Sequence, residues 1–377
     1  AALACCGFPL GVGHLLSTAA FDLTAWMALL WLTARLLRTD DPRWWLAFGA
    51  VAGLALWNKH LVVMLAITVL VGLALARRWR LLRSPWLLAG GGLALLIVLP
   101  NLLWQADHDW PQLEMAEALS ERLAGENRAT LFPLQLLFGG PLLAVVLFTG
   151  ARALGREEPL RPFRALLWMW PVGLAITFVT AGRPYYVMPL TVVVLIAGVV
   201  TWVGQERQRL LTGLLLVSTV VTIPLALPVL PTGAVDVTGV VNEAAVESIG
   251  WPELVDQVAA VVRGLPEDEQ EDVILLALTY GEAGAIDRFG PARGLPAAYS
   301  GHNSYADFRE PSDPDATVVA IRYRPDRLGA HFVDCEQVAT IDNGHDVDNE
   351  IQDQPITLCR GLRRPWPEIW DALRRFS

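Results

Sequence analysis

The chain has 377 residues, of which 54% are hydrophobic and 18% are charged, and its mean hydropathy is +0.41. This balance is too apolar for an ordinary soluble domain of this size and excludes a plain cytoplasmic enzyme. The charge is uneven, because residues 1–230 hold 17 Lys and Arg against 12 Asp and Glu, whereas residues 231–377 hold 12 against 26. The acidic second part would repel phosphate, so nucleic acid is not an expected partner.

Residues 1–230 contain a regular series of apolar runs near the roughly 20 residues that a helix needs to cross a membrane. They predict a partial helix at 1–16 followed by about eight membrane helices. These helices are expected at about 20–37, 44–58, 60–76, 86–104, 132–151, 165–181, 185–203 and 210–228. Position 1 is not methionine, and residues 1–16 lack the basic start and cleavage site of a signal peptide, so we interpret the chain as N-terminally truncated.

Basic residues predict the direction of these helices, because short cytoplasmic loops retain Lys and Arg. Thirteen of the 17 basic residues fall in alternate connections between the predicted helices, and only Lys59, Arg122, Arg128 and Arg183 fall in the others. The alternation predicts a multi-pass protein of the plasma (inner) membrane whose C-terminal part lies outside the cytoplasm.

From about residue 231 the pattern changes to alternating helix and strand signals, after a linker rich in proline and glycine. Residues 251–263 have helical spacing, and 281–289 fit a short helix. Residues 273–279 and 317–323 are β-rich apolar runs. The pattern predicts a small α/β domain.

The predicted fold is therefore mainly α, with a polytopic transmembrane helix bundle at 1–230 and a small extracytoplasmic α/β domain at 231–377. Cys5 and Cys6 lie in an apolar helix and are expected to pack there. Cys335 and Cys359 either form a disulfide, which an oxidising compartment permits, or are unbonded neighbours. The chain has no CxxC or HExxH spacing, so no structural zinc site is expected.

Topology gathers polar residues from four separate connections at the outer end of the predicted helices. They are Asp22, Asn58, Lys59, His60, Gln105, Asp107, His108, Asp109, Arg183, Tyr185 and Tyr186. Lys59, the single lysine of the chain, lies among apolar residues, where it either marks a substrate path or extends its ammonium to the interface. Arg183 with Tyr185 and Tyr186 either grips a lipid-linked phosphate or anchors the helix in the interface.

The acidic residues of this rim also allow two interpretations each. Asp22 either stabilises a helix start through the dipole or is a ligand for a metal or an acceptor. Asp107, His108 and Asp109 either bind a hard cation or deprotonate an acceptor hydroxyl, or they are solvated loop residues. A divalent cation is thus an open option, and no cofactor is required by the sequence.

Two segments of the second part, YGEAGAIDRFGP and YSGHNSY, carry Glu282, His302 and Asn303. Turn chemistry and a surface position would explain them, and sugar recognition is the alternative. Together with His60 and His108 they are the candidates for acceptor or sugar binding.

Four runs of the first part, GHLLSTAAFDLTAW, LLRTDDPRWWLAFGAVAGLALWNKH, LPNLLWQADHDWPQLE and GRPYYVMPL, resemble bacterial glycosyltransferase family 39. This family includes protein O-mannosyltransferases and the lipid A aminoarabinose transferase. The segment YGEAGAIDRFGPARGLPAAYSGHNSY and the pattern from Cys359 to Trp366 resemble the exported C-terminal domain of one bacterial subgroup. The resemblance therefore covers nearly the whole chain.

The resemblance implies a transferase of the GT-C type that moves a sugar from a polyprenyl-phosphate carrier to a lipid, glycan or protein acceptor. Transfer would occur at the outer membrane face, with inversion at the anomeric carbon. Lys59 and Arg183 would meet the charge that develops on the phosphate, and Tyr185 and Tyr186 would donate to the same oxygens.

The acceptor hydroxyl also needs a carboxylate to take its proton. The family's usual base lies in an acidic pair of the first outer loop, which this chain lacks. Asp22, Asp107 and Asp109 are therefore the candidate bases.

Two rival functions remain. A transporter or flippase of lipid-linked saccharide would show inverted repeats and helices broken in mid-membrane. A non-catalytic membrane scaffold would bind glycan through the second part of the chain alone.

Overall fold

The computed structural model describes residues 6–239 and 242–376, except for the side chains of residues 118–122 and 141. The predicted start of the partial helix, Cys5 and the side chain of Arg122 therefore lie outside the described residues. The chain divides into two compact units, Ala1–Val229 and Leu230–Ser377, which we call the helical unit and the sheet unit.

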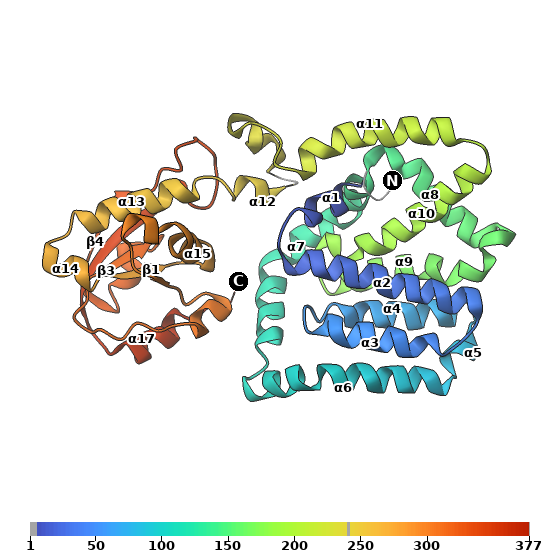
Figure 1. The fold of residues 1–377 in the computed structure, drawn as a ribbon, viewed down its shortest axis with the longest axis horizontal. Coiled ribbons are helices and arrows are strands. Elements are labelled where there is room, and N and C mark those ends of the chain that lie inside the picture. Colours follow the sequence, from blue (N-terminus) through green and yellow to red (C-terminus); the bar gives the residue numbers. More distant parts are fainter. Residues whose placement is uncertain (1–5, 240–241, 377) are drawn as a thin grey trace. The chain divides into compact units, whose positions relative to one another are not determined.

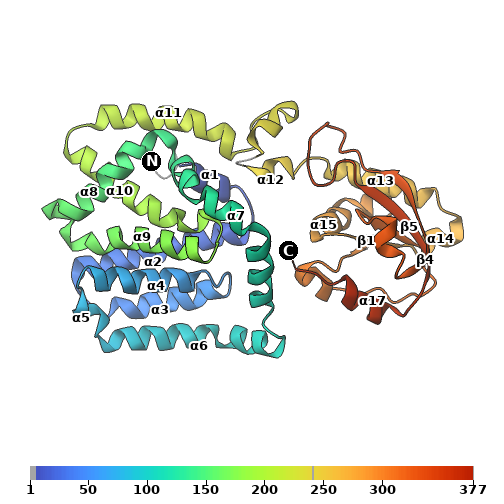
Figure 2. The same ribbon diagram turned by 180° about the vertical axis from the view of Figure 1, so that it is seen from behind.

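The helical unit consists of α-helices joined by short connections (Figures 1 and 2). Its helices are α1 (Gly7–Gly13), α2 (Thr18–Thr39), α3 (Trp44–Leu56), α4 (Val62–Leu75), α5 (Trp79–Leu82), α6 (Pro85–Asp107), α7 (Pro111–Gly139), α8 (Ala144–Arg156), α9 (Arg164–Val179), α10 (Met188–Gly204) and α11 (Gln208–Ala226). Short 3₁₀ turns lie at Pro141–Leu143, Glu158–Phe163 and Pro184–Val187.

Several of these helices can span a membrane, which confirms the predicted class of fold. Within the described residues, five segments are long and apolar enough, namely Thr18–Thr39, Pro85–Asp107, Glu158–Val179, Pro184–Gly204 and Gln208–Ala226. A first correction concerns length, because two of the predicted membrane helices, α3 and α4, are shorter than a full span. α3 has 13 residues and α4 has 14, which is about 20 Å at a rise of roughly 1.5 Å per residue and short of a hydrocarbon core of about 30 Å.

A second correction concerns the helix predicted over 132–151, which is broken. Leu123–Gly139 and Ala144–Arg156 meet at an angle of 98°. Gly140 has φ +99°, a conformation that side chains rarely permit, and Pro141 follows it without an amide hydrogen for the helix ladder. The residues before 132 were expected to form a connection, but they form the first half of α7. This half contains Glu and Arg residues, so it was not recognised as a helix from its hydropathy.

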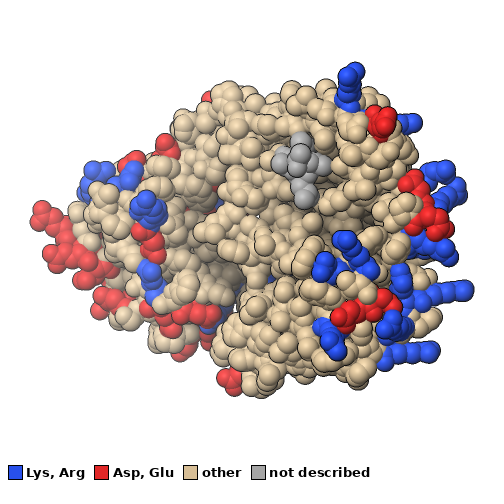
Figure 3. All heavy atoms as spheres, turned by 45° about the vertical axis from the view of Figure 1, so that its right-hand side comes forward, with Lys and Arg blue, Asp and Glu red and all other residues tan. Residues whose placement is uncertain are grey.

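The two ends of the helical unit differ in charge. The connections α2–α3, α4–α6, α8–α9 and α10–α11 lie at one end (Figure 1). Figure 3 shows the Lys and Arg side chains of the helical unit gathered toward that end. The connections α1–α2, α3–α4, α6–α7 and α9–α10 lie at the opposite end, where Lys59 and Arg183 are located.

The sheet unit contains a five-stranded mixed sheet in the order β2-β1-β3-β5-β4. The strands are β1 (Ile274–Ala277), β2 (Ala298–Tyr299), β3 (Val318–Ile321), β4 (Phe332–Thr340) and β5 (Pro355–Leu362). β1 pairs in parallel with β2 and β3, whereas β5 is antiparallel to both β3 and β4. The helices are α12 (Glu243–Val246), α13 (Trp251–Arg263), α14 (Glu267–Glu271), α15 (Tyr280–Phe289), α16 (Pro325–Leu328) and α17 (Trp366–Leu373).

Helices cover both faces of this sheet. Leu275 and Val319 pack with apolar residues of α13 and α15 on one face, whereas Leu276 and Ala320 pack with those of α17 on the other. The central strands are consequently buried on both faces and read as continuous apolar runs, which is why β1 and β3 were predictable.

Cys335 and Cys359 face each other across β4 and β5 with their Cα atoms 4.2 Å apart, and they form a disulfide. Of the two predicted alternatives, the bonded one is therefore the case. Cys6 is buried in the helical unit.

Candidate active site

Lys59 lies between α3 and α4, where the polar residues that follow Leu56 end the helix. Its ammonium is 3.5 Å from the Tyr185 hydroxyl. It is also 5.4 Å from the ring centroid of Tyr185 and 4.8 Å from that of Tyr186. The two rings meet edge to face at 87°, so the ammonium contacts two aromatic faces at once.

Both connections that form this contact are anchored by hydrogen bonds. Asn58 Nδ2 donates to the Thr18 carbonyl at 2.9 Å and thereby joins the α3–α4 connection to the start of α2. Trp57 Nε1 donates to the Ile97 carbonyl of α6 at 2.9 Å. These bonds hold the backbone around Lys59 between two helices.

The α9–α10 connection is held by α7. Asn127 Nδ2 donates to the Ala181 carbonyl at 2.8 Å, and Gln135 Nε2 donates to the Pro184 carbonyl at 2.6 Å. Arg128 Nε donates to the Phe178 carbonyl at 3.1 Å, at the end of α9. The sequence analysis did not identify these three residues. Their spacing of seven and eight positions, which places them on one face of a helix in an apolar stretch, could have indicated them.

Arg183 is half-buried, and its charge acts on Tyr185 and Tyr186. Within the described part of the chain its side chain forms no hydrogen bond and no ion pair, and Lys59 likewise has no carboxylate within 4.0 Å. Among the described residues the site thus contains two cations and two phenols, and no carboxylate lies within 4.0 Å of either cation. Such a group can bind an anion with several oxygens, such as a phosphate.

Asp22 lies in the second turn of α2 and is only 7% exposed. Its Oδ1 has no hydrogen-bond partner among the described residues, and its charge is attracted by Lys59. A helix dipole acts mainly on the first turn, so stabilisation of the helix start does not account for this residue. A buried carboxylate with a vacant acceptor atom can take a proton or accept a hydrogen bond from a ligand.

The other rim residues have different neighbours. His60 Nδ1 lies 3.2 Å from Gln112 Oε1 at the start of α7, and Gln105 Oε1 accepts from the Gln112 amide at 3.3 Å. His108 stacks on Trp104 with ring centroids 4.2 Å apart and lies 4.0 Å from the Asp107 carboxylate.

Asp107, His108 and Asp109 are exposed. No hydrogen bond or ion pair joins them to Lys59 or Arg183 within the described residues. The described chain also brings no three His, Cys, Asp or Glu residues together in a group that could hold a metal ion.

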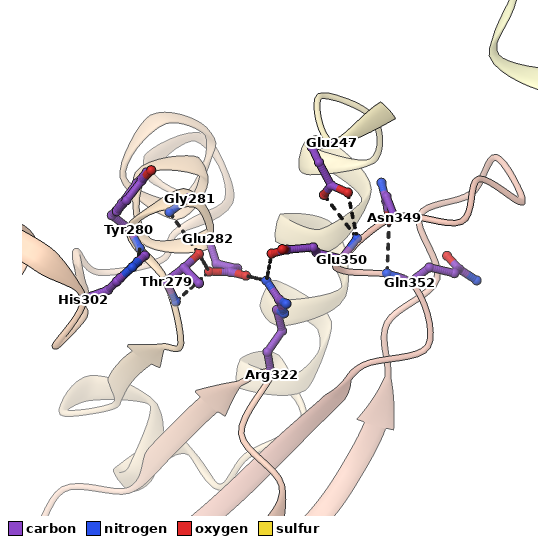
Figure 4. A network of polar contacts seen from close by, with 10 residues as sticks. All are labelled: Glu247, Thr279, Tyr280, Gly281, Glu282, His302, Arg322, Asn349, Glu350 and Gln352. Carbon is purple, nitrogen blue, oxygen red and sulfur yellow. Dashed lines mark hydrogen bonds and ion pairs between the residues drawn. The ribbon is translucent and has the colours of Figure 1, made fainter. Parts of the chain in front are cut away.

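Glu282 of the sheet unit is fully buried and has structural partners (Figure 4). Its carboxylate accepts from the Thr279 amide at 2.8 Å and from the Thr279 hydroxyl, which completes a capping box at the start of α15. The second oxygen accepts from Arg322 Nη1 at 2.5 Å.

His302 is buried, and its Nδ1 accepts a hydrogen bond of 3.3 Å from the Tyr280 amide. The Asn303 amide donates to the Arg375 carbonyl at 2.9 Å. Glu282, His302 and Asn303 therefore lie together in the sheet unit, whereas Lys59, Arg183 and Asp22 lie in the helical unit.

Residues 1–104 match the family model described as dolichyl-phosphate-mannose-protein mannosyltransferase. The matched segment includes Asp22 and Lys59 and ends before Arg183. No curated protein and no solved structure matches the chain. The match covers little more than a quarter of the chain, and it supports the resemblance to membrane glycosyltransferases of the GT-C, family-39-like type that the motifs indicated.

Proposed function

We propose that the protein transfers a sugar from a polyprenyl-phosphate carrier to an acceptor at the outer face of the plasma membrane, with inversion. The observation that carries this proposal is the contact of Lys59 with Tyr185 and Tyr186, next to Arg183 and with no ion pair within 4.0 Å among the described residues. The family match supports a lipid-linked donor.

The chemistry requires stabilisation of the leaving phosphate. When the bond between the anomeric carbon and the phosphate oxygen breaks, negative charge grows on that oxygen, and a preorganised cation lowers the barrier most when it is already desolvated. Lys59 and Arg183 supply the two cations, and the Tyr185 hydroxyl is positioned to donate to the same oxygens.

The acceptor oxygen forms the new bond to the anomeric carbon from the opposite side, and its proton passes to a carboxylate. Asp22 is the first candidate for this base, because it is buried close to Lys59 and has a vacant acceptor atom. Asp107 and Asp109 remain the alternatives. A glycan, lipid or protein acceptor fits equally, with His60 and His108 as its candidate contacts at the same end of the helices.

Two observations support the proposed orientation. The arginine-rich connections lie at one end of the helical unit, which is typical of a cytoplasmic side. The disulfide of the sheet unit is typical of an oxidising compartment, so we place this unit outside the cytoplasm.

The test uses full-length protein reconstituted in vesicles with a radiolabelled polyprenyl-phosphate mannose. Lys59→Ala and Arg183→Ala should each lower transfer about 10²- to 10³-fold, the size seen when one transition-state donor is removed. Lys59→Arg should retain part of the activity. Arg209→Ala, at the other end of the helical unit, is the matched control and should transfer sugar at the wild-type rate.

Wild-type turnover in both alanine variants would refute the assignment, provided that membrane insertion and thermal stability are unchanged. Loss of activity in Arg209→Ala as well would show that the assay reports the loss of any arginine rather than loss of this site.

One observation favours the rival flippase, namely the bend of 98° between the second half of α7 and α8. Vesicles with a fluorescent lipid-linked saccharide in one leaflet distinguish the two functions. Fast exchange between leaflets without transfer to any acceptor would support the flippase, whereas transfer without exchange supports the transferase.

A further inference from the structure

The parallel part of the sheet has a topological switch point. From β1 the chain passes through α15 to β2 on one side, and β3 lies on the other side of β1. In open α/β sheets, ligands bind outside the carboxyl ends of the strands at such a point. The segments that meet there are 278–282 after β1, 300–303 after β2 and 322–323 after β3.

An aromatic platform lies at this edge. Tyr280 is 54% exposed, although one face of its ring stacks on the buried His302 with centroids 4.7 Å apart and planes 10° apart. The Tyr280 amide donates to His302 Nδ1 at 3.3 Å, which ties the first segment to the second. Figure 4 shows the two rings beside Glu282. A rigidly backed and exposed ring of this kind offers an apolar surface to a flat ligand.

Paired charges continue from the platform (Figure 4). Arg322, with a side chain only 12% exposed, donates to Glu282 at 2.5 Å and to Glu350 at 3.2 Å. The Glu350 amide is in turn held by both carboxylate oxygens of Glu247, at 3.1 and 3.2 Å. The Glu350 side chain is 53% exposed, so its carboxylate keeps acceptor capacity toward solvent.

These features favour a neutral ligand that has both an apolar face and hydroxyl groups. Arg322 is already neutralised by two carboxylates, and residues 231–377 carry 26 acidic against 12 basic residues, which disfavours an anion. A pyranose ring presents one face of C–H groups and a rim of hydroxyl donors. Its C–H face matches Tyr280, and its hydroxyls match Glu350.

We propose that the carboxyl ends of β1, β2 and β3 form a binding site for a neutral saccharide, with Tyr280 as the platform and Glu350 as a hydroxyl acceptor. Arg322 of the buried Glu282–Arg322 pair holds Glu350, and His302 supports the Tyr280 ring. This site goes beyond the proposed transfer reaction, because binding requires neither the donor nor the Lys59 cluster. Its sugar comes either from an acceptor glycan or from the donor's own headgroup.

The test is saturation-transfer NMR on the full chain in lipid nanodiscs, with methyl α-mannoside and methyl β-glucoside as neutral probes and glucuronic acid as the charged comparison. Wild type should bind at least one neutral probe more tightly than glucuronic acid. Tyr280→Ala should weaken that binding about tenfold or more, and Tyr280→Trp should retain it. Phe308→Ala is the matched control, because Phe308 is an exposed aromatic whose ring contact is with Tyr305.

Absence of binding in wild type, preference for glucuronic acid, or unchanged binding by Tyr280→Ala would each overturn the proposal. Lys59→Ala should bind the neutral probe as wild type does while it loses transfer. If Lys59→Ala and Arg183→Ala both keep wild-type transfer, the assignment of these residues to the donor phosphate fails and the saccharide site stands. Competition between the probe and a polyprenyl-phosphate sugar would identify the donor headgroup as the natural ligand, and its absence would identify an acceptor.

Discussion

The two units use their half-buried and buried charges in opposite ways. In the helical unit, Lys59 and Arg183 contact or face tyrosines and form no ion pair within 4.0 Å among the described residues. In the sheet unit, Arg322 contacts two carboxylates, and Glu282 contacts both Arg322 and Thr279. A charge whose partners are all supplied by the fold stabilises that fold, whereas a charge without partners is available to a ligand.

This difference also separates the ligands that we propose. The unpaired cations of the helical unit suit a phosphate, and the neutralised network of the sheet unit suits an uncharged sugar. The type of residue alone does not distinguish the phosphate site from the sugar site, because burying either an unpaired lysine or an unpaired glutamate costs free energy. What distinguishes them is whether other residues of the fold already neutralise the charged side chain.

The largest effect is expected for Glu282→Ala. It leaves Arg322 buried with one exposed partner and removes the capping box, so the sheet unit should lose about 3 kcal/mol of stability. Hydrogen exchange of the sheet unit within the full chain measures this loss. Glu350→Ala, which removes the exposed partner, should cost under about 1 kcal/mol; equal losses in both variants would contradict the role given to burial.

Tyr185→Phe tests the unpaired cluster. It removes the hydroxyl that lies 3.5 Å from Lys59 and keeps the ring, so transfer should fall about tenfold through kcat. Tyr186→Phe should have a smaller effect, because Lys59 contacts Tyr186 through the ring. A fall in the apparent affinity alone, with kcat unchanged, would show that the hydroxyl binds the ground state only.

The smallest effect concerns a paired group near the surface. Arg360 Nε and Nη2 donate to Glu269 at 3.0 and 2.8 Å, and these bonds, with one from Thr317, lower the pKa of the Glu269 carboxyl below its usual range. Because this pKa is lower in the folded state, the ionised carboxylate stabilises the fold at pH values above the usual carboxyl pKa. The stabilisation is lost as the pH falls through the folded-state pKa and the carboxylate is protonated. Glu269→Gln should therefore cost about 1 kcal/mol at neutral pH and progressively less in acid.

Urea unfolding followed by hydrogen exchange at neutral and acidic pH measures this difference. Glu271→Gln is the control, because Glu271 is exposed and has no ion pair within the described residues. A penalty for Glu269→Gln that persists unchanged in acid would rule out the charge as its cause.

Long apolar runs made part of the fold predictable. The expected ranges for α2, α6, α10 and α11 lie within a few residues of the observed ones, because a helix is the usual way to satisfy backbone groups in hydrocarbon. The first half of α7 was missed because it is polar, and the break at Gly140 was missed because nothing in local hydropathy marks it. β2, β4 and β5 were not predicted either; β2 has only two residues and β4 is largely exposed.

Of the candidate site, the sequence indicated the residue types and the end of the bundle. Lys59 and Tyr185 are 126 positions apart, and only a topological argument could suggest that they meet. The anchors Asn127, Arg128 and Gln135 went unrecognised, because each bonds to a backbone carbonyl about 50 residues away that carries no signature of its own.

Hydropathy, charge counts and short motifs were sufficient to predict a membrane helix bundle, a polar C-terminal α/β part and a resemblance to family-39 transferases, because each of these depends on local stretches of the sequence. The sequence did not show which charged side chains are neutralised by others. From the sequence, Glu282 was a candidate for sugar binding, but in the structure its carboxylate accepts hydrogen bonds from Arg322 and Thr279. Lys59 contacts tyrosines that lie in a connection far away in the sequence. Such pairing depends on contacts between segments far apart in sequence, which exist only once the helices and strands have packed.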